Sequence, residues 1–240
     1  MPRFVIVFRL VIVFCLSAGC CFLMGTLTPS AKAADPPSRP VPESRSEDGY
    51  IPLFNGRDLQ GWTVRRADRR GYVVEKGLLV CPADGGGFLF TDKENGDFSL
   101  RFEFRLTPGA NNGVAIRCPL LDERPAYDGI EIQILDDIGY PRPLRPAQYH
   151  GSIYDVVAAK RGAVKPAGQW NCEEVVCCGS RVTVIVNGTV VVDVDLEQIT
   201  DPRVLKRHPG LKRRRGHIGF LGHGSRVEFR NIRIKPLDCS

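Results

Sequence analysis

Strict alternation of apolar and polar residues in short runs most limits how this chain can fold. Residues 98–106 alternate phenylalanine or leucine with serine, arginine and glutamate. The two-residue period recurs at 130–134, 182–186 and 190–194. Such spacing places one set of side chains on each face of a β-strand. We therefore expect these runs to be strands with one buried face, and the buried set to include Phe98, Leu100, Phe102, Phe104, Ile130, Ile132, Val184 and Phe229.

Turn signals separate the runs. Asn187-Gly188 joins two valine-rich runs, and this dipeptide is preferred in type I′ hairpins. Near the end, the alternation changes phase across Arg230-Asn231, as a β-bulge would cause. Helical periodicity is nearly absent, with space for a turn or two at 196–204. A dozen or so strands without crossover helices predict an all-β fold, a two-sheet antiparallel β-sandwich of jelly-roll type.

Composition and charge exclude several classes of protein. The 240 residues are 43% hydrophobic and 25% charged, which argues against disorder and against a multi-span membrane protein. The formal net charge of +6 includes three basic residues in the first 33 and no acidic residue there. Residues 34–240 hold 30 basic and 27 acidic residues, a net charge of +3. This charge predicts no nucleic-acid partner.

The N-terminus has the pattern of an export signal. Arg3 and Arg9 precede an apolar run at 10–27, and Ala31-Lys32-Ala33 forms an A-x-A cleavage site. A signal peptide at 1–33 predicts an exported protein, periplasmic or extracellular. Two alternatives stay open: a lipoprotein-type signal ending at Cys20, and an uncleaved anchor, since about 18 apolar residues approach a membrane span.

Two further segments follow the signal. Residues 34–48 are a proline-rich polar linker without apolar periodicity, and residues 49–240 carry all the strand patterns. We therefore expect a single β-sandwich domain at 49–240. Membrane contact is expected only through an uncleaved N-terminus.

Six cysteines lie outside the predicted signal, namely Cys81, Cys118, Cys172, Cys177, Cys178 and Cys239. Export permits disulfides, but the adjacent Cys177 and Cys178 would point to opposite faces of a strand. We expect zero to two bridges. No C-x₂-C pair repeats and no histidine stands at zinc-finger spacing, so no thiolate metal site is expected.

Two surface motifs have structural interpretations that outweigh functional ones. The sequon Asn187-Gly188-Thr189 is better read as a hairpin turn than as a glycosylation site, because the flanking strands need the turn. The basic run 212–215 is better read as a solvated loop than as a polyanion site, given the small net charge.

Polar and aromatic side chains suited to carbohydrate gather in several segments. Carbohydrate sites need carboxylates, amides and arginines for hydroxyl groups, and an aromatic ring for a sugar face. The candidates come from strand alternation, loops and a glycine-flanked turn. They are Arg117, Glu131, Gln133, Asp136, Asp137, Tyr149, His150, Tyr154, Lys165, Trp170, Asn171 and His223.

Seven motifs in order resemble the 3-keto-disaccharide hydrolase family. They are PLFNGRDLQGW, NNGVAIR, YDGIEIQILDD, GSIYDV, KPAGQWN, VNG and GHIGFLGHGSRVEFRNIRI, between Tyr50 and Leu237. The resemblance implies a concanavalin A-like jelly roll that acts on 3-keto-glycosides. It also implies bacterial, often exported, relatives, some of which are lyases or hydratases.

The resemblance extends structurally to family-16 glycoside hydrolases, whose strand signature is Glu-x-Asp-x(-x)-Glu. Here Glu131 keeps the first carboxylate, Gln133 replaces the second, and Asp136 is a shorter third. Retaining hydrolysis needs two carboxyl groups about 5–5.5 Å apart. The amide at position 133 therefore argues against ordinary retaining chemistry.

A ketone at C3 of the sugar permits another route. It acidifies the proton on C2, so one base can remove that proton, expel the C1 aglycone and allow water to add. Glu131 is the leading base and His223 its partner, as catalytic residues. Arg117 and Gln133 would hold the ketone or a hydroxyl, and Asp136, Tyr154, Lys165, Trp170 and Asn171 complete the predicted substrate-binding set.

Several alternatives stay open. A divalent cation on Glu131, Asp136 and His223 would also polarise the ketone, so the cofactor is undetermined. Glu131 would otherwise be a solvated strand residue, His223 a turn residue, and Tyr154 and Trp170 core or rim. The expected partner is an oligosaccharide or 3-keto-glycoside substrate. One rival function is a non-catalytic, lectin-like carbohydrate-binding module, since such sandwiches serve as both enzymes and lectins. A structural or adhesion domain is the other, favoured if the N-terminus is retained as an anchor.

Overall fold

Two antiparallel β-sheets form the fold in a computed structural model that describes residues 49–65 and 71–239. The predicted signal peptide and the predicted linker lie outside these residues, and both stay predictions. Among the described residues, no helix is long and apolar enough to cross a membrane.

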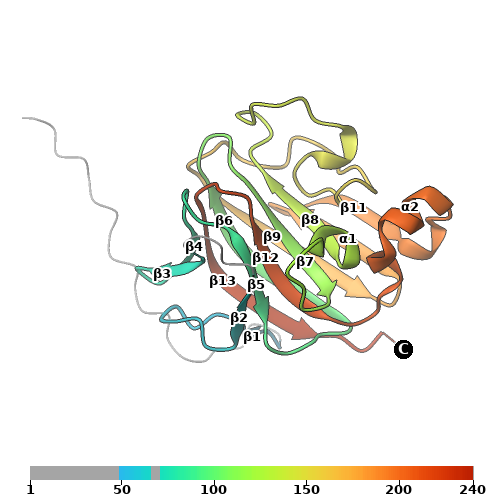
Figure 1. Cartoon of the computed structure of the whole chain (residues 1–240), viewed down its shortest axis with the longest axis horizontal. Helices are drawn as coiled ribbons and strands as arrows, with labels where there is room; N and C mark the ends of the chain where they lie inside the picture. Colours follow the sequence, from blue (N-terminus) through green and yellow to red (C-terminus); the bar gives the residue numbers. More distant parts are fainter. Residues whose placement is uncertain (1–48, 66–70, 240) are drawn as a thin grey trace, which may run out of the picture. The chain divides into compact units, whose positions relative to one another are not determined.

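The larger sheet has eight strands in the order β11-β10-β9-β6-β13-β4-β3, with β1 also paired to β13 (Figure 1). The strands are β1 (Ile51–Pro52), β3 (Val73–Glu75), β4 (Leu78–Cys81), β6 (Phe98–Leu106), β9 (Trp170–Cys178), β10 (Arg181–Val186), β11 (Thr189–Asp195) and β13 (Val227–Pro236).

The smaller sheet has five strands in the order β2-β5-β12-β7-β8. They are β2 (Trp62–Arg65), β5 (Gly87–Thr91), β12 (His217–Gly222), β7 (Asn111–Cys118) and β8 (Ile130–Leu135). Short helices join some strands: α1 (Pro125–Asp128), η1 (Pro146–Gln148), η2 (Leu196–Gln198), α2 (Pro202–Arg207) and η3 (Pro209–Lys212). The prediction of an all-β, two-sheet antiparallel sandwich is confirmed.

The main core lies between the two sheets and is built by the alternating residues. All eight residues expected in the core are buried, with exposed fractions of 2% or less. A second, smaller apolar cluster lies on the opposite face of the five-stranded sheet and consists of Phe88, Phe90, Ala115, Cys118 and Leu221. The five-stranded sheet therefore has buried residues on both faces. On its outer face, the polar residues of β8 lie next to the apolar residues of β7, β12 and β5.

The local predictions of turn and bulge are confirmed. Val186 pairs with Thr189, and Asn187 and Gly188 both have positive φ, as a type I′ turn requires. The Asn187 amide nitrogen donates to Ala163 O and Asn171 Oδ1, both at 2.8 Å. The pairing of β13 with β6 shifts register between Arg230 and Arg233, where Asn231 has a φ of 51°.

The basic run and the cysteines also have defined places. Arg213 donates to Asp128 O, Arg214 pairs with Glu197 and Arg215 pairs with Glu94, so these side chains bond to the chain's own groups. Cys178 forms a disulfide with Cys239, which is within the expected number of bridges. Of the other described cysteines, Cys172 is exposed and Cys81, Cys118 and Cys177 are buried free thiols.

Candidate functional site

The outer face of the five-stranded sheet brings Glu131 and His223 together. Glu131 points away from the main core because Ile130 and Ile132 on either side of it fill that core. Its side chain is only 3% exposed, and its Oε1 lies 3.7 Å from His223 Nε2. His223 follows the end of β12, and its side chain is 42% exposed. The pair therefore joins a buried carboxylate to an imidazole that reaches solvent.

A glycine on the strand between them makes this approach possible. β7 separates β8 from β12, and its Gly113 pairs with Gln133 on one side and Leu221 on the other. Any side chain at Gly113 would collide with Glu131 Oε1. The carboxylate thus crosses over β7 through the space that glycine leaves. Oε1 is buried and has no hydrogen-bond partner among the described residues, which leaves it free to act on a bound molecule.

Tyr154 lies on the other side of Glu131. The segment after β8 returns along its free edge, where Ile132 pairs with Ile153 and Tyr154 N–H donates to Glu131 O at 2.9 Å. Burial is the main cause that raises the pKa of Tyr154, and the charge of Glu131 contributes in the same direction. A neutral phenol beside a carboxylate can donate a hydrogen bond to a ligand.

Gln133 is the fourth polar group of this face, two residues along β8 from Glu131. Its side chain is buried, and its amide nitrogen donates to Asn111 Oδ1 at 3.1 Å. The second amide N–H and the carbonyl oxygen give it further bonding capacity. We call Glu131, Gln133, Tyr154 and His223, with the apolar cluster of Phe88, Phe90, Ala115 and Leu221 beside them, the Glu131 site.

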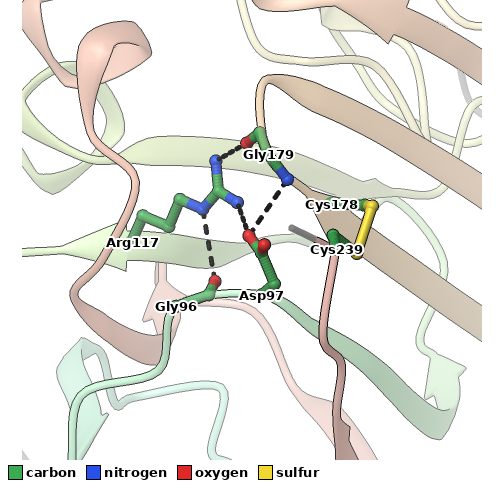
Figure 2. The surroundings of a disulfide bond; sticks show 6 residues. All are labelled: Gly96, Asp97, Arg117, Cys178, Gly179 and Cys239. Atoms are coloured by element: carbon green, nitrogen blue, oxygen red, sulfur yellow. Dashed lines mark hydrogen bonds and ion pairs between the residues drawn. A yellow bond between two sulfur atoms is a disulfide. The ribbon is translucent and has the colours of Figure 1, made fainter.

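Arg117 is not part of this site, which corrects its assignment as a substrate-binding residue. Its side chain is fully buried and makes an ion pair with Asp97 at 2.8 Å. It also donates to Gly179 O at 2.8 Å and to Gly96 O at 3.4 Å. Figure 2 shows these bonds next to the Cys178–Cys239 disulfide. Because Arg117 has a φ of 50°, β7 leaves regular alternation there, and the guanidinium ties the turns before β6 and after β9.

Trp170 lies on the other sheet. The alternation of β9 buries Asn171 and Glu173 towards the core and leaves Trp170 on the outer face of the eight-stranded sheet. There its ring is covered by Arg230 at 4.0 Å and Arg105 at 4.8 Å. Trp170 and Glu131 therefore belong to opposite faces of the sandwich, and Trp170 is not a sugar platform for the Glu131 site.

Three other predicted ligand-binding residues stabilise loops instead. Asp136 accepts backbone N–H groups from Gly109 and Ile138. Asn171 accepts from the backbone N–H of Lys165, whose ammonium donates to Trp170 O. No group of three or more histidine, cysteine or acidic residues is placed to hold a metal among the described residues, so Asp136 does not join Glu131 and His223 as the cation alternative required.

A cavity of about 250 Å³ lies on the outer face of the eight-stranded sheet. Three of its charged residues are paired within the protein: Arg101 contacts Glu174 at 3.0 Å, and Glu103 contacts Arg230 at 2.7 Å. Its lining also includes Glu173, whose carboxylate is fully buried and faces the core, whereas Glu131 lies beside the exposed His223. The Glu131 site is therefore the better candidate for chemistry.

Sequence reasoning missed a second histidine–glutamate pair inside the sandwich. His150 Nε2 lies 3.2 Å from Glu173 Oε2, and the two side chains are 3% and 0% exposed. A signal for it existed, because Glu173 alternates with the buried Val175 and Cys177 and so had to face the core. The role of Gly113 was missed too, since only the packing reveals which strand Glu131 crosses.

Comparisons with known proteins agree with this architecture. The family described as 3-keto-alpha-glucoside-1,2-lyase-like domains matches residues 49–235. A 3-keto-disaccharide hydrolase of Bacteroides thetaiotaomicron is 28% identical, over 87% of this chain and 85% of its own length. A candidate glycosyl hydrolase of Parabacteroides distasonis has a solved structure with 26% identity and a TM-score of 0.69, covering 80% of this chain and 95% of that one.

A more distant likeness concerns the fold alone. A Bacillus subtilis protein with a galectin-like fold is 12% identical, with a TM-score of 0.51 over 78% of this chain and 94% of its own. It supports the jelly-roll class of the sandwich.

Proposed function

The chain belongs to the 3-keto-alpha-glucoside-1,2-lyase-like family, and from this premise we propose that it cleaves 3-keto-glycosides with Glu131 as the base. The observation that carries the proposal is the buried Oε1 of Glu131, which has no hydrogen-bond partner among the described residues and lies 3.7 Å from His223. A general base must have an oxygen that is not already bonded and that a substrate proton can reach, and this oxygen meets the first requirement. The names of the family and of its relatives support a carbohydrate-directed, hydrolase-like activity.

The proposed reaction begins at C2 of the oxidised sugar. The Glu131 carboxylate takes the C2 proton, and the electron pair of that C–H bond moves to form an enolate with the C3 ketone. The enolate collapses, a C1=C2 double bond forms, and the C1–O bond to the aglycone breaks. His223 gives a proton to the departing oxygen, since its exposed ring can exchange protons with water.

Tyr154 and Gln133 flank Glu131 and are the donors proposed for the enolate oxygen. A fixed donor that faces developing negative charge stabilises the transition state more than the ground state. Tyr154 takes the part that sequence reasoning gave to Arg117. Water then adds to C1 of the enone and a proton returns to C2, so the net reaction is hydrolysis of the glycosidic bond.

The test offers the purified protein 3-keto-glucosides and the matching unoxidised disaccharides in deuterated water, with and without a chelator. We expect cleavage of the oxidised substrates only, with deuterium incorporated at C2. Cleavage of unoxidised disaccharides without C2 exchange would contradict the proposal and favour ordinary glycosidase chemistry. Saccharide binding without any turnover would favour the carbohydrate-binding alternative. The chelator arm decides whether a divalent cation takes part.

A further inference from the structure

The buried pair of His150 and Glu173 lies in the core, beside apolar residues of β6 and β10. On β9, Glu173 pairs with Phe102 of β6 on one side and with Val186 of β10 on the other. The His150 ring stacks on Phe104, with ring centroids 5.0 Å apart. Neither carboxylate oxygen of Glu173 has a hydrogen-bond partner of good geometry among the described residues, and the polar group that approaches it is His150, whose Nε2 lies 3.2 Å from Oε2.

The His150 ring has a hydrogen bond at Nδ1 and a close contact with Glu173 at Nε2. Its Nδ1 accepts the backbone N–H of Leu135 at 3.1 Å. A neutral imidazole that accepts at Nδ1 carries its proton on Nε2, and that nitrogen lies 3.2 Å from Glu173 Oε2. The ring therefore connects the end of β8 to the middle of β9 with one defined orientation.

Stability is a poor explanation for such a pair. Moving two polar or charged groups out of water costs free energy, and apolar residues of similar volume commonly serve a core as well or better. Buried polar pairs are better known for selecting one arrangement of neighbouring segments over others. The question is which segment this pair arranges.

The segment that follows His150 is the one that lines the Glu131 site. Gly151 N–H donates to Gln133 O at 2.8 Å, and Gln133 N–H donates to Ser152 O at 3.0 Å. Tyr154 N–H donates to Glu131 O in the same ladder. A slip of one residue in this ladder would turn Tyr154 to the opposite face of the sheet.

His150 is well placed to prevent that slip. It stands opposite Leu135, at the start of the ladder, on a connection of 34 residues between β8 and β9. Gly151, with a φ of +77°, turns the chain so that residue 150 leaves the alternation of 152 and 154. Figure 1 shows this long connection in yellow-green beside the end of β8.

We propose that Glu173 is a positioning residue for the Glu131 site. Through His150 it fixes the register of residues 151–154 on β8, and thereby the place of Tyr154 beside Glu131. The kinetic consequence rests on the proposed function, whereas the register itself can be measured without any substrate.

The first test replaces Glu173 and follows cleavage of a 3-keto-glucoside. Glu173→Leu should lower kcat about tenfold or more with KM within about twofold, because misplaced groups cost rate when the transition state forms. Glu173→Gln should recover most of the rate, since its amide oxygen keeps a polar acceptor opposite His150 Nε2. Glu174→Leu is the matched control, because the neighbouring residue faces the outer side of β9, and it should stay within about twofold of the wild type. Full activity in Glu173→Leu would overturn the proposal.

A double-mutant cycle identifies the residue through which Glu173 acts. If it acts through Tyr154, the effect of Glu173→Leu should largely vanish when Tyr154 is already phenylalanine. Rate losses that multiply in the double variant would show that Glu173 supports the fold in general, and would contradict the assignment.

Hydrogen exchange of backbone amides tests the register directly. In Glu173→Leu, the amides of Gly151, Gln133 and Tyr154 should exchange at least about tenfold faster than in the wild type, while β6 amides change little. If that variant fails to fold, the double variant His150→Phe/Glu173→Leu, which removes both side chains of the buried pair, takes its place. Unchanged exchange at all three amides would refute the positioning role. Absence of 3-keto-glycoside cleavage in the wild type would instead refute the proposed function and leave the exchange result to decide the register.

Discussion

Two histidine–glutamate pairs serve as a natural comparison within this sandwich. His223 and Glu131 lie on the outer face of the five-stranded sheet, 3.7 Å apart, and the histidine is 42% exposed. His150 and Glu173 lie between the sheets, 3.2 Å apart, and neither side chain exceeds 3% exposure. The residue types are the same, and the difference is access to solvent.

Access decides what each pair can do. A base or acid in turnover must exchange protons with substrate and water, which His223 can do and His150 cannot. A pair sealed in the core instead holds one geometry, because breaking it leaves an uncompensated polar group. The same two residue types thus yield a candidate catalytic pair on the outer face of the five-stranded sheet and a positioning pair between the two sheets.

Glu131→Gln should produce the largest effect. The amide keeps the shape of the side chain but cannot accept the C2 proton, so kcat should fall on the order of a hundredfold or more. The free energy of unfolding should stay equal or rise, because a buried oxygen without a hydrogen-bond partner is no longer charged. Rate assays and urea unfolding check both parts. Full activity in Glu131→Gln would remove it from the base role.

His223→Ala should have a smaller effect, about tenfold in kcat, because water can replace part of an exposed proton donor. Its exposure also predicts chemical rescue: imidazole in the buffer should restore part of the rate. His150→Ala is the comparison, and its activity should not respond to imidazole, since its site is closed to solvent. Equal rescue of both variants would show that the two histidine sites do not differ in their access to solvent.

The buried carboxyl group of Glu173 should make the free energy of unfolding depend on pH. Burial raises the pKa of Glu173, and its bond to His150 opposes that rise. The folded protein therefore holds this proton more tightly than the unfolded chain. The contribution to stability is fully present below the ordinary glutamate pKa of about 4.3 and is lost as pH rises through the raised folded value.

The measurement is urea unfolding of the wild type and Glu173→Gln at several pH values from about 4 upward. Relative to the variant, the wild type should lose stability across this window. Glu174→Gln serves as the control and should keep or enlarge the wild-type loss, because bonds to Ser99 and Arg101 lower the pKa of Glu174 and its own contribution to stability therefore increases as pH rises. A flat difference between wild type and Glu173→Gln would indicate that the carboxyl group is not perturbed by burial.

Alternation predicted the two faces of each strand with success. It gave the buried residues of β6 and β8, the turn at Asn187-Gly188 and the phase change in β13, because all of these depend on neighbours within a few residues. It also placed Glu131 and Gln133 on the polar side of their strand. The pairing of Glu131 with His223 was proposed from the sequence and agrees with their distance in the structure.

The failures of sequence reasoning share one cause. Arg117, Trp170 and Asn171 have the chemistry of ligand-binding residues, yet each is bonded to other parts of the chain. Arg117 bonds Gly179, 62 residues away in sequence, and Asn171 bonds Asn187, 16 residues away, so no local pattern specifies these partners.

The sequence by itself determined the all-β class, the faces of the strands and the family, because these follow from short-range periodicity and ordered motifs. Only the tertiary structure decided which polar side chains are bonded within the protein and which are available to a ligand. Sheet order sets Gly113 between Glu131 and His223, and the turn at Gly151 sends His150 inward to Glu173. The same two residue types became an exposed pair and a sealed pair because solvent access is a property of packing.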